Sequence, residues 1–301
     1  MDGKFKAWWM IVAWGIVLPG RAQVLYPQGA VEVPTYRLVR PAFSPGESLH
    51  YEFSWNGLRS AEAEIAVLSD PAAPDQVHFQ AQSRTVGLAG LLWKMQDGAE
   101  TWSSREDLKP SISLLHVREP TIQFDRKVVF DHQLGTATSR KSSSGEERKR
   151  VLEIRNGYDP LSLLFVVRNL DWKAGDERRF EVVDGEERYL LVLRALVEEQ
   201  VTGRVGTFRA MKFSPALIRL PRRLQGETPR FFERLRLREA GRPQLIKTVE
   251  FWIALDPPRP LLRVRSEAWI GHVDMELIEE SNLNPGPGSG RAKAAPDLRK
   301  P

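Results

Sequence analysis

The stretch NGYDPLSLLFVVRNL, residues 156–170, decides the fold, because it has the pattern of one long helix in a chain that otherwise alternates like strands. Asp159 can accept hydrogen bonds from the free N–H groups of a first helical turn, and Pro160 at the first helical position loses no bond there. Apolar residues follow on nearly every face, which is typical of a buried helix. We therefore expect a mainly β fold, in which a large curved antiparallel sheet or half-open β-barrel wraps one buried α-helix.

Hairpin signals run through the rest of the chain. Tyr51, Phe53 and Trp55 alternate with polar residues as in a half-buried strand, and Asn56-Gly57 after them is the strongest two-residue hairpin signal. Asp184-Gly185 predicts a second tight hairpin. About a dozen strands joined in this way predict a meander, in which the order along the chain is the order in the sheet, and such a sheet curls or closes to hide its edges.

Three segments depart from the strand pattern. Residues 87–95 are apolar at helical spacing and predict one or two helical turns at an end of the sheet. Residues 142–147 are rich in serine and predict a mobile loop. Residues 221–243 crowd arginine around a few apolar residues, and we expect an irregular hairpin or a loop insertion whose role the sequence leaves open.

Both ends of the chain differ from its middle. Residues 1–22 have a basic start, an apolar run and small residues before a cleavage point after Ala22, which predicts a secretory signal peptide. The run is shorter than the ~20 residues that span a bilayer, so an uncleaved anchor is the weaker alternative, and no later stretch could span one. Residues 23–45 predict an extended lead-in, residues 46–280 one β-rich domain, and residues 281–301 a disordered basic tail rich in proline and glycine.

Composition excludes several classes of function. The chain has no cysteine, which excludes disulfides, thiol catalysis and cysteine-bound zinc. Its net charge of +5 comes from the two ends, so we expect no nucleic-acid partner for the neutral middle. An exported protein without disulfides suggests the periplasm of a Gram-negative bacterium.

The chemistry-bearing residues form no recognisable motif. The five histidines are scattered singly, and phosphate-binding loops and nucleophile elbows are missing, so we predict no catalytic residue, no metal and no cofactor. Asp159 is better explained as a helix cap than as a functional acid. The residues with a predicted structural role are Asn56, Gly57, Asp159, Pro160, Asp184 and Gly185.

Aromatic residues are the strongest sign of a binding site. They are spread over strands that should share one concave side, where they either fill a core on the helix or line an apolar cavity for one lipid-sized ligand. The candidate ligand-binding residues are Tyr51, Phe53, Trp55, Trp93, Trp102, Phe130, Leu164 and Trp252.

Several short motifs occur in a fixed order. They are Gly46-Glu47-Ser48-Leu49-His50-Tyr51, Trp55-Asn56-Gly57, Asp159-Pro160-Leu161-Ser162, the F-x-x-x-D-G of residues 180–185, and Trp252 followed by the prolines of residues 256–260. In this order they resemble the exported bacterial family called domain of unknown function 3108, over residues 46–279. The resemblance implies a periplasmic β-rich fold. The family carries no established activity, so it implies no catalytic residue.

Three functions remain open at this point. The first is non-enzymatic binding of an apolar or amphipathic component of the cell envelope, such as a lipid or an acyl chain. The second is a scaffolding or protein-interaction module, which would use the sheet edge, residues 221–243 or the tail on an envelope protein. The third is a hydrolase of envelope polymers, which would need clustered acids or histidines in a cleft.

Overall fold

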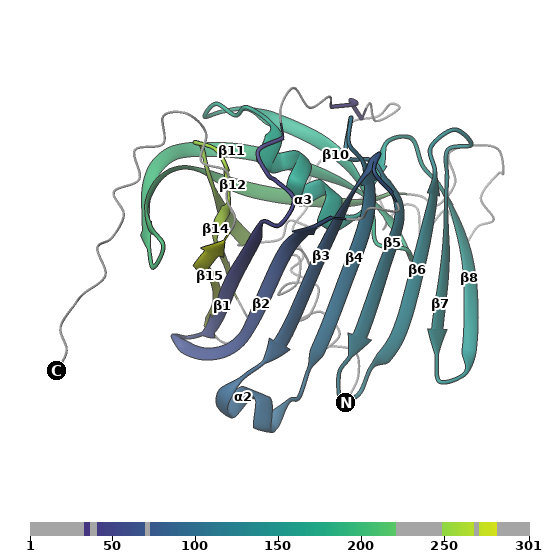
Figure 1. The fold of residues 1–301 in the computed structure, drawn as a ribbon, viewed down its shortest axis with the longest axis horizontal. Coiled ribbons are helices and arrows are strands. Elements are labelled where there is room, and N and C mark those ends of the chain that lie inside the picture. Colours follow the sequence, from purple (N-terminus) through teal and green to yellow (C-terminus); the bar gives the residue numbers. More distant parts are fainter. Residues whose placement is uncertain (1–32, 37–40, 70–72, 221–248, 268–270, 282–301) are drawn as a thin grey trace.

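A computed structural model describes residues 33–36, 41–69, 73–220, 249–267 and 271–281 (Figure 1). Within these ranges the chain forms one 15-stranded sheet and two helices, so the prediction of a mainly β fold is confirmed. The expected signal peptide, the arginine-rich residues 221–243 and nearly all of the expected tail lie outside the described residues.

The first eight strands form an antiparallel meander in which each strand pairs with the next. Between β3 and β4 lies a short helix, α2 (Gly87–Leu92), in the region where helical turns were expected. The strands are β1 (Ser48–Trp55), β2 (Leu58–Leu68), β3 (Gln76–Thr85), β4 (Gln96–Ser104), β5 (Pro110–Arg118), β6 (Gln123–Asp131), β7 (Thr136–Ser143) and β8 (Glu146–Glu153).

The second half begins with a two-residue strand and the central helix α3 (Pro160–Asn169). The helix crosses over the sheet, so β9 and β10 are parallel, whereas the remaining strands continue as an antiparallel meander. The strands are β9 (Gly157–Tyr158), β10 (Glu177–Val183), β11 (Arg188–Gly203), β12 (Gly206–Leu220), β13 (Val249–Ala254), β14 (Leu261–Glu267) and β15 (His272–Ser281).

The two meanders join through β1 and β15, which are hydrogen-bonded neighbours in the middle of the sheet. The sheet is not closed, because β8 and β9 follow each other in the chain but form its two edges. The order along the chain is therefore the order in the sheet within each half, as expected, but not across the whole sheet.

Side chains connect the two edges where strand pairing stops. The Glu181 carboxylate on β10 accepts hydrogen bonds from the backbone N–H groups of Arg155 (2.8 Å) and Asn156 (2.9 Å), which link β8 to β9. Arg188 on β11 forms a buried ion pair with Glu181 and supplies the balancing charge. The Glu181 carboxylate therefore gives the link between β8 and β9 the hydrogen bonds that a strand ladder would otherwise supply.

The N-terminus of α3 is fixed by Asp159. Its Oδ1 accepts from the N–H groups of Leu161 (2.9 Å) and Ser162 (3.3 Å) and from the hydroxyl of Thr101 on β4 (2.9 Å). Seven residues of the helix are buried, and it packs against β3, β4 and β10. Phe165 stacks on Phe79 of β3, with ring centroids 3.8 Å apart.

A buried charge at the other end of α3 ties the helix to two loops. The Arg168 guanidinium forms a 2.7 Å ion pair with Glu47, just before β1, and both side chains are almost fully buried. Arg168 also donates to the carbonyls of Pro258 and Arg259, at 3.0 Å each, between β13 and β14. Removing one member of such a pair leaves an uncompensated buried charge, so the pair holds these segments in one arrangement.

Residues 142–147 do not form the expected loop. They form the end of β7, a turn at Ser144 and Gly145, and the start of β8. Both turn residues have positive φ, at 51° and 83°, as a tight two-residue hairpin requires. The serine-rich composition hid this hairpin, because it predicts flexibility equally well.

Candidate functional site

A cavity of about 750 Å³ lies between α3 and the inner face of the sheet. Figure 1 shows α3 at one end of strands β3 to β5 and α2 at the other end. Leu163, Leu164 and Val167 form the helix side of the cavity. The opposite walls come from both meanders, and most of the lining side chains are apolar.

Three cross-strand rows explain why the space exists. In the row nearest to α3, Phe79 pairs with Thr101, and both contact the helix or its cap. In the next row Ala81 and Ala99 pair with each other, and they leave a gap because alanine is too short to reach the helix. The third row pairs Ser83 with Asp97, and there the wall becomes polar.

The wall across the cavity is a fourth row with large side chains. Phe251, Val264, Met275 and Phe53 are successive register partners on β13, β14, β15 and β1, and all four line the cavity. The cavity therefore crosses the junction of the two meanders, and neither half could form it alone.

Two carboxyl groups gather at the polar end, away from α3. Asp97 is the second residue of β4, and Glu119 lies in the turn between β5 and β6; both line the cavity and are only 8% and 4% exposed. Asp97 accepts a 2.8 Å hydrogen bond from the backbone N–H of Arg118. Among the described residues, no group forms a hydrogen bond or ion pair with the Glu119 carboxylate.

Burial shifts the titration of both acids. It raises the pKa of Asp97 to about 6, although the backbone hydrogen bond and the positive charge of Arg118 act against the shift. Burial, together with the neighbouring charge of Asp97, raises the pKa of Glu119 to about 7. Such shifts in a cavity are typical of functional groups, although structural networks produce them too.

The basic groups of the wall already have acidic partners. Arg126 on β6 forms a 2.5 Å ion pair with Glu186 and donates to the Asp184 carbonyl at 2.7 Å. Lys141 on β7 lies 3.2 Å from the same Glu186 carboxylate and 4.0 Å from the centre of the Phe124 ring. The β10–β11 turn therefore reaches across the open edge of the sheet and contacts the inner face of β6 and β7.

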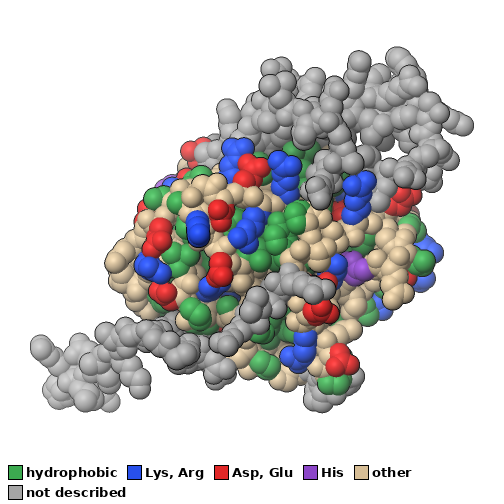
Figure 2. Space-filling model, turned by 90° about the horizontal axis from the view of Figure 1, so that it is seen from above, with side chains coloured by type: hydrophobic (Ala, Val, Ile, Leu, Met, Phe, Trp, Pro, Cys, Tyr) green, Lys and Arg blue, Asp and Glu red, His purple; other side chains and the backbone are tan. Residues whose placement is uncertain are grey.

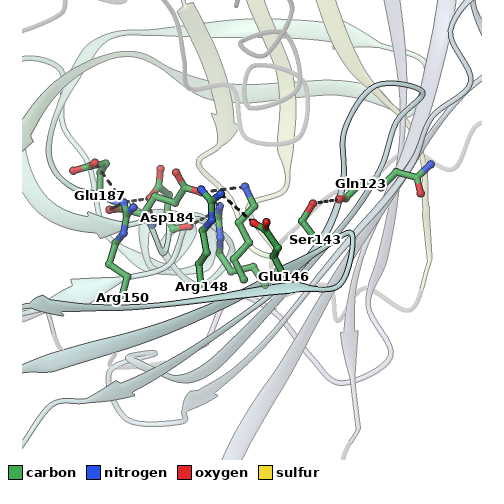
Figure 3. A network of polar contacts seen from close by, with 10 residues as sticks. Gln123, Ser143, Glu146, Arg148, Arg150, Asp184 and Glu187 are labelled. Atoms are coloured by element: carbon green, nitrogen blue, oxygen red, sulfur yellow. Dashed lines mark hydrogen bonds and ion pairs between the residues drawn. The ribbon is translucent and has the colours of Figure 1, made fainter.

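Figure 3 shows how this network continues along β8. Arg150 donates to the Glu186 carbonyl at 3.0 Å and lies 3.7 Å from Glu187. Farther along, Arg148 pairs with Glu146 at 3.2 Å. A second, more polar hollow of about 730 Å³ adjoins these residues.

The candidate ligand residues from the sequence are not gathered in one place. Phe53 and Leu164 line the cavity. Tyr51 and Trp252 are buried in the main core, and Phe130 lies in a separate apolar cluster with Val128 and Leu152.

The other three tryptophans among the candidate ligand residues lie on or near the protein surface. Trp55 is 39% exposed at the end of β1, and Trp93 is half-buried at the end of α2. Trp102 lies on the opposite face of β4 from the buried Thr101 and Ser103, where it stacks on His78 at 4.1 Å.

The remaining surface offers few other sites within the described part of the chain. There, no three His, Asp or Glu residues come together as metal ligands would. Of the two helices described, neither is long and apolar enough to cross a bilayer. On the face that Figure 2 shows, the acidic and basic side chains of the described residues are interspersed.

Sequence reasoning missed Asp97 and Glu119. The available signal was the inward face of β4, where Asp97, Ala99, Thr101 and Ser103 are small or polar although they are buried. An inward face of small and polar residues indicates that it does not pack directly against large apolar side chains of other strands. Here α3 and the cavity lie opposite it.

Comparison with known proteins identifies a family. The model of a family described as a protein of unknown function, DUF3108, matches residues 50–278. A search of curated proteins finds no match.

The solved structures to which this chain is similar share little sequence with it. A β-barrel-like protein of the DUF1849 family from Brucella abortus has 8% identity and a TM-score of 0.46, covering 78% of this chain and 97% of its own. A "putative lipoprotein" from Parabacteroides distasonis has 9% identity and a TM-score of 0.34, with 80% and 98% covered. A "putative exported protein with YmcC-like fold" from Bacteroides fragilis has 10% identity and a TM-score of 0.30, with 81% and 99% covered.

Proposed function

This chain belongs to the DUF3108 family of proteins of unknown function, and we propose that it is a non-enzymatic protein that binds an amphipathic molecule of the cell envelope by its acyl chain. The observation that carries the proposal is the cavity of about 750 Å³ with its largely apolar wall. Pockets for small molecules have volumes of roughly 300–1,000 Å³ and are lined in this way.

The proposed binding mode uses the whole fold. The curved sheet acts as a half-open barrel around α3, the helix closes one end, and the acyl chain lies against Leu163 and Leu164. Each buried methylene contributes about 0.8 kcal/mol, so a chain of about ten contributes roughly 8 kcal/mol before the entropic cost of binding. The entropic cost of binding offsets several kcal/mol of this gain.

The proposal includes an exported location, in the periplasm of a Gram-negative bacterium. The apolar run in residues 1–22 and the lack of cysteine support it. Fractionation of cells that express the full chain tests this part: a mature protein that starts after Ala22 in the periplasmic fraction is expected.

The binding test uses two substitutions that fill the gap between the sheet and the helix. We expect Ala81→Phe and Ala99→Phe each to weaken binding of a fluorescent fatty acid at least about 10-fold, because the new ring occupies the space of several methylenes. Ala174→Phe, in an exposed loop, is the matched control and should bind like the unmodified protein. The protein is purified without detergent, and native mass spectrometry checks for bound lipid.

Two results would overturn the proposal. One is a lack of saturable probe binding together with no co-purified lipid. The other is probe binding that both cavity-filling variants leave unchanged, although circular dichroism shows that they are folded.

The exposed leucines of α2 favour a second candidate, an interaction module for an envelope protein. Leu88, Leu91 and Leu92 are 77%, 83% and 87% exposed. Large exposed apolar groups in one place often mark a binding surface. Under this candidate, Leu88→Ser/Leu91→Ser loses a partner that the unmodified chain retains in pull-down experiments, while fatty-acid binding is unchanged.

A further inference from the structure

We propose that Asp97 and Glu119 bind the polar head of the ligand, and that this head is a protonated amine. The inference rests on the proposed function, because it places the head at the polar end of the same cavity. It names a class of ligand, cationic single-chain amphiphiles, that an apolar cavity alone does not select.

Asp97 and Glu119 both lie where their side chains line the cavity. Asp97 continues the inward row of Ala63 and Ser83, and all three line the cavity. Glu119 is held in a tight turn by hydrogen bonds between its own backbone and that of Ile122, at 3.0 and 3.3 Å. Its carboxylate is nearly buried and lines the cavity, and none of the described residues binds it.

The balance of charge in the wall favours a cation over an anion. Arg126 and Lys141 share the Glu186 carboxylate, so their charges are partly matched inside the protein. Arg126 keeps one unpaired donor, Nε, which is the observation in favour of an anionic head. An anion would, however, enter a wall that also contains two acids: Asp97, which accepts from the backbone N–H of Arg118, and Glu119, whose carboxylate none of the described residues binds.

An ammonium group satisfies both acids at once. A buried carboxylate without a cation or donor is unfavourable, and a bound cation removes that penalty while it gains charge-assisted hydrogen bonds. The raised pKa values of both acids agree with this picture, because burial outweighs the compensation that Arg118 gives to Asp97, and the charge of Asp97 adds to the effect of burial on Glu119.

Binding of an amine should therefore depend on pH. Between pH 5 and 8 Asp97 and Glu119 become ionised, whereas an alkylamine, like lysine, stays protonated. The other charged groups that face them are Arg118 on β5, Arg126 on β6, Lys141 on β7, and Asp184 and Glu186 in the β10–β11 turn. Glu186, whose pKa is lowered mainly by the charges of Arg126 and Lys141, is ionised throughout this range.

Asp184 could contribute to the same pH dependence, because burial raises its pKa. Its carboxylate caps its own turn, however, by accepting from the N–H groups of Glu186 and Glu187 at 2.7 Å each. The variant experiment below separates its contribution from that of the pair.

The test compares three probes with the same chain: dodecylammonium, dodecanol and dodecanoate. Each displaces the neutral dye N-phenyl-1-naphthylamine from the full chain, purified without detergent. At pH 8 we expect dodecylammonium to bind at least about 10-fold more tightly than dodecanol, the effect of one charge-assisted hydrogen bond. The advantage should disappear by pH 5.

Two variants link this preference to the pair. Glu119→Gln and Asp97→Asn should each reduce the ratio of dodecylammonium to dodecanol affinity measured within the same variant, and the double variant should bring this ratio to one. Saturable dodecanol binding also shows that a variant is folded. Glu106→Gln, an exposed acid in the β4–β5 turn, is the matched control and should keep the full preference.

The outcomes separate the two proposals. Equal affinity for amine and alcohol, a preference that survives the double variant, or tightest binding of dodecanoate overturns the amine head but leaves the acyl-chain cavity in place. Failure of all three probes to displace the dye overturns both. The comparison of probes in the unmodified protein decides the question even if no variant folds.

Discussion

Position 185 requires glycine for two reasons, a positive φ and the close approach of neighbouring side chains. Its φ of +86° belongs to the left-handed region, and a Cβ there would lie 2.6 Å from Arg126 Cδ and 2.8 Å from Val128 Cγ2. Gly175 has a similar φ of +91° but no atom near the position of its Cβ. A comparison of Gly185 with Gly175 therefore separates the cost of backbone strain from the cost of a steric clash at Cβ.

We expect Gly185→Ala to lower the free energy of unfolding by about 3 kcal/mol and Gly175→Ala by about 1 kcal/mol. The difference arises because only Gly185 packs on the inner face of β6. Urea unfolding of both variants measures it. Equal losses would mean that the β10–β11 turn does not press on β6.

The acid pair also has an effect on stability. Burial raises the pKa of Glu119 from 4.5 to about 7, so the folded protein prefers the protonated form. A raised pKa gives stability that is fully present below the unfolded value and is lost as the pH rises through the folded value. The ionised pair therefore destabilises the empty protein at neutral pH.

Replacing Glu119 with glutamine should remove this loss. We expect Glu119→Gln to unfold at nearly the same urea concentration as the unmodified protein at pH 4, and to be more stable by about 2 kcal/mol at pH 8. Unfolding curves at half-unit steps between pH 4 and 8 measure it. A constant difference between the two proteins across this range would contradict the assignment.

At the scale of an element, α3 depends on its N-cap residue, Asp159. Asp159→Ala removes the acceptor for two backbone N–H groups and leaves the Thr101 hydroxyl buried without a partner. We expect a loss of about 2–3 kcal/mol in the free energy of unfolding, the sum of a lost cap and an unpaired hydroxyl. Asp159→Asn keeps the Oδ1 acceptor and is the matched control, with an expected loss below about 1 kcal/mol. A loss in the Asn variant as large as in the Ala variant would show that the charge, not the cap, matters.

Elements were predictable where a local signal exists. Asp159-Pro160 marked the start of α3, and Asn56-Gly57 marked the β1–β2 turn, because each signal acts within a few residues. The Asn56 side chain also accepts a 3.0 Å hydrogen bond from the N–H of His272, across the sheet, and no local pattern indicates that contact. The β7–β8 hairpin was missed because its signal, Ser144-Gly145, is a weak one.

At the scale of the whole molecule, alternation alone could not decide which face of a strand lies inside. Trp102 and Thr101 alternate on β4, and hydrophobicity favours the tryptophan as the inner residue. The structure places Thr101 inside, because it binds the cap of α3, a residue far along the chain. Of the eight candidate ligand residues, only Phe53 and Leu164 line the cavity.

The pairing of β1 with β15 has a consequence for how the molecule folds. Other neighbours in the sheet are close in sequence, whereas Leu49 pairs with Glu280. Closing so long a loop is entropically costly, and contacts of this kind form late in folding. We expect Leu277→Ala on β15 to speed unfolding with little effect on the folding rate, and Met211→Ala in the β11–β12 hairpin to slow folding.

Stopped-flow refolding and unfolding of both variants measures these rates. A slower folding rate for Leu277→Ala would contradict the late formation of the β1–β15 pairing. Phe53 and Met275, which pair across the same junction, both line the cavity. The cavity is therefore complete only after β1 has paired with β15. A dye that binds in the cavity should gain fluorescence only in the last kinetic phase of refolding.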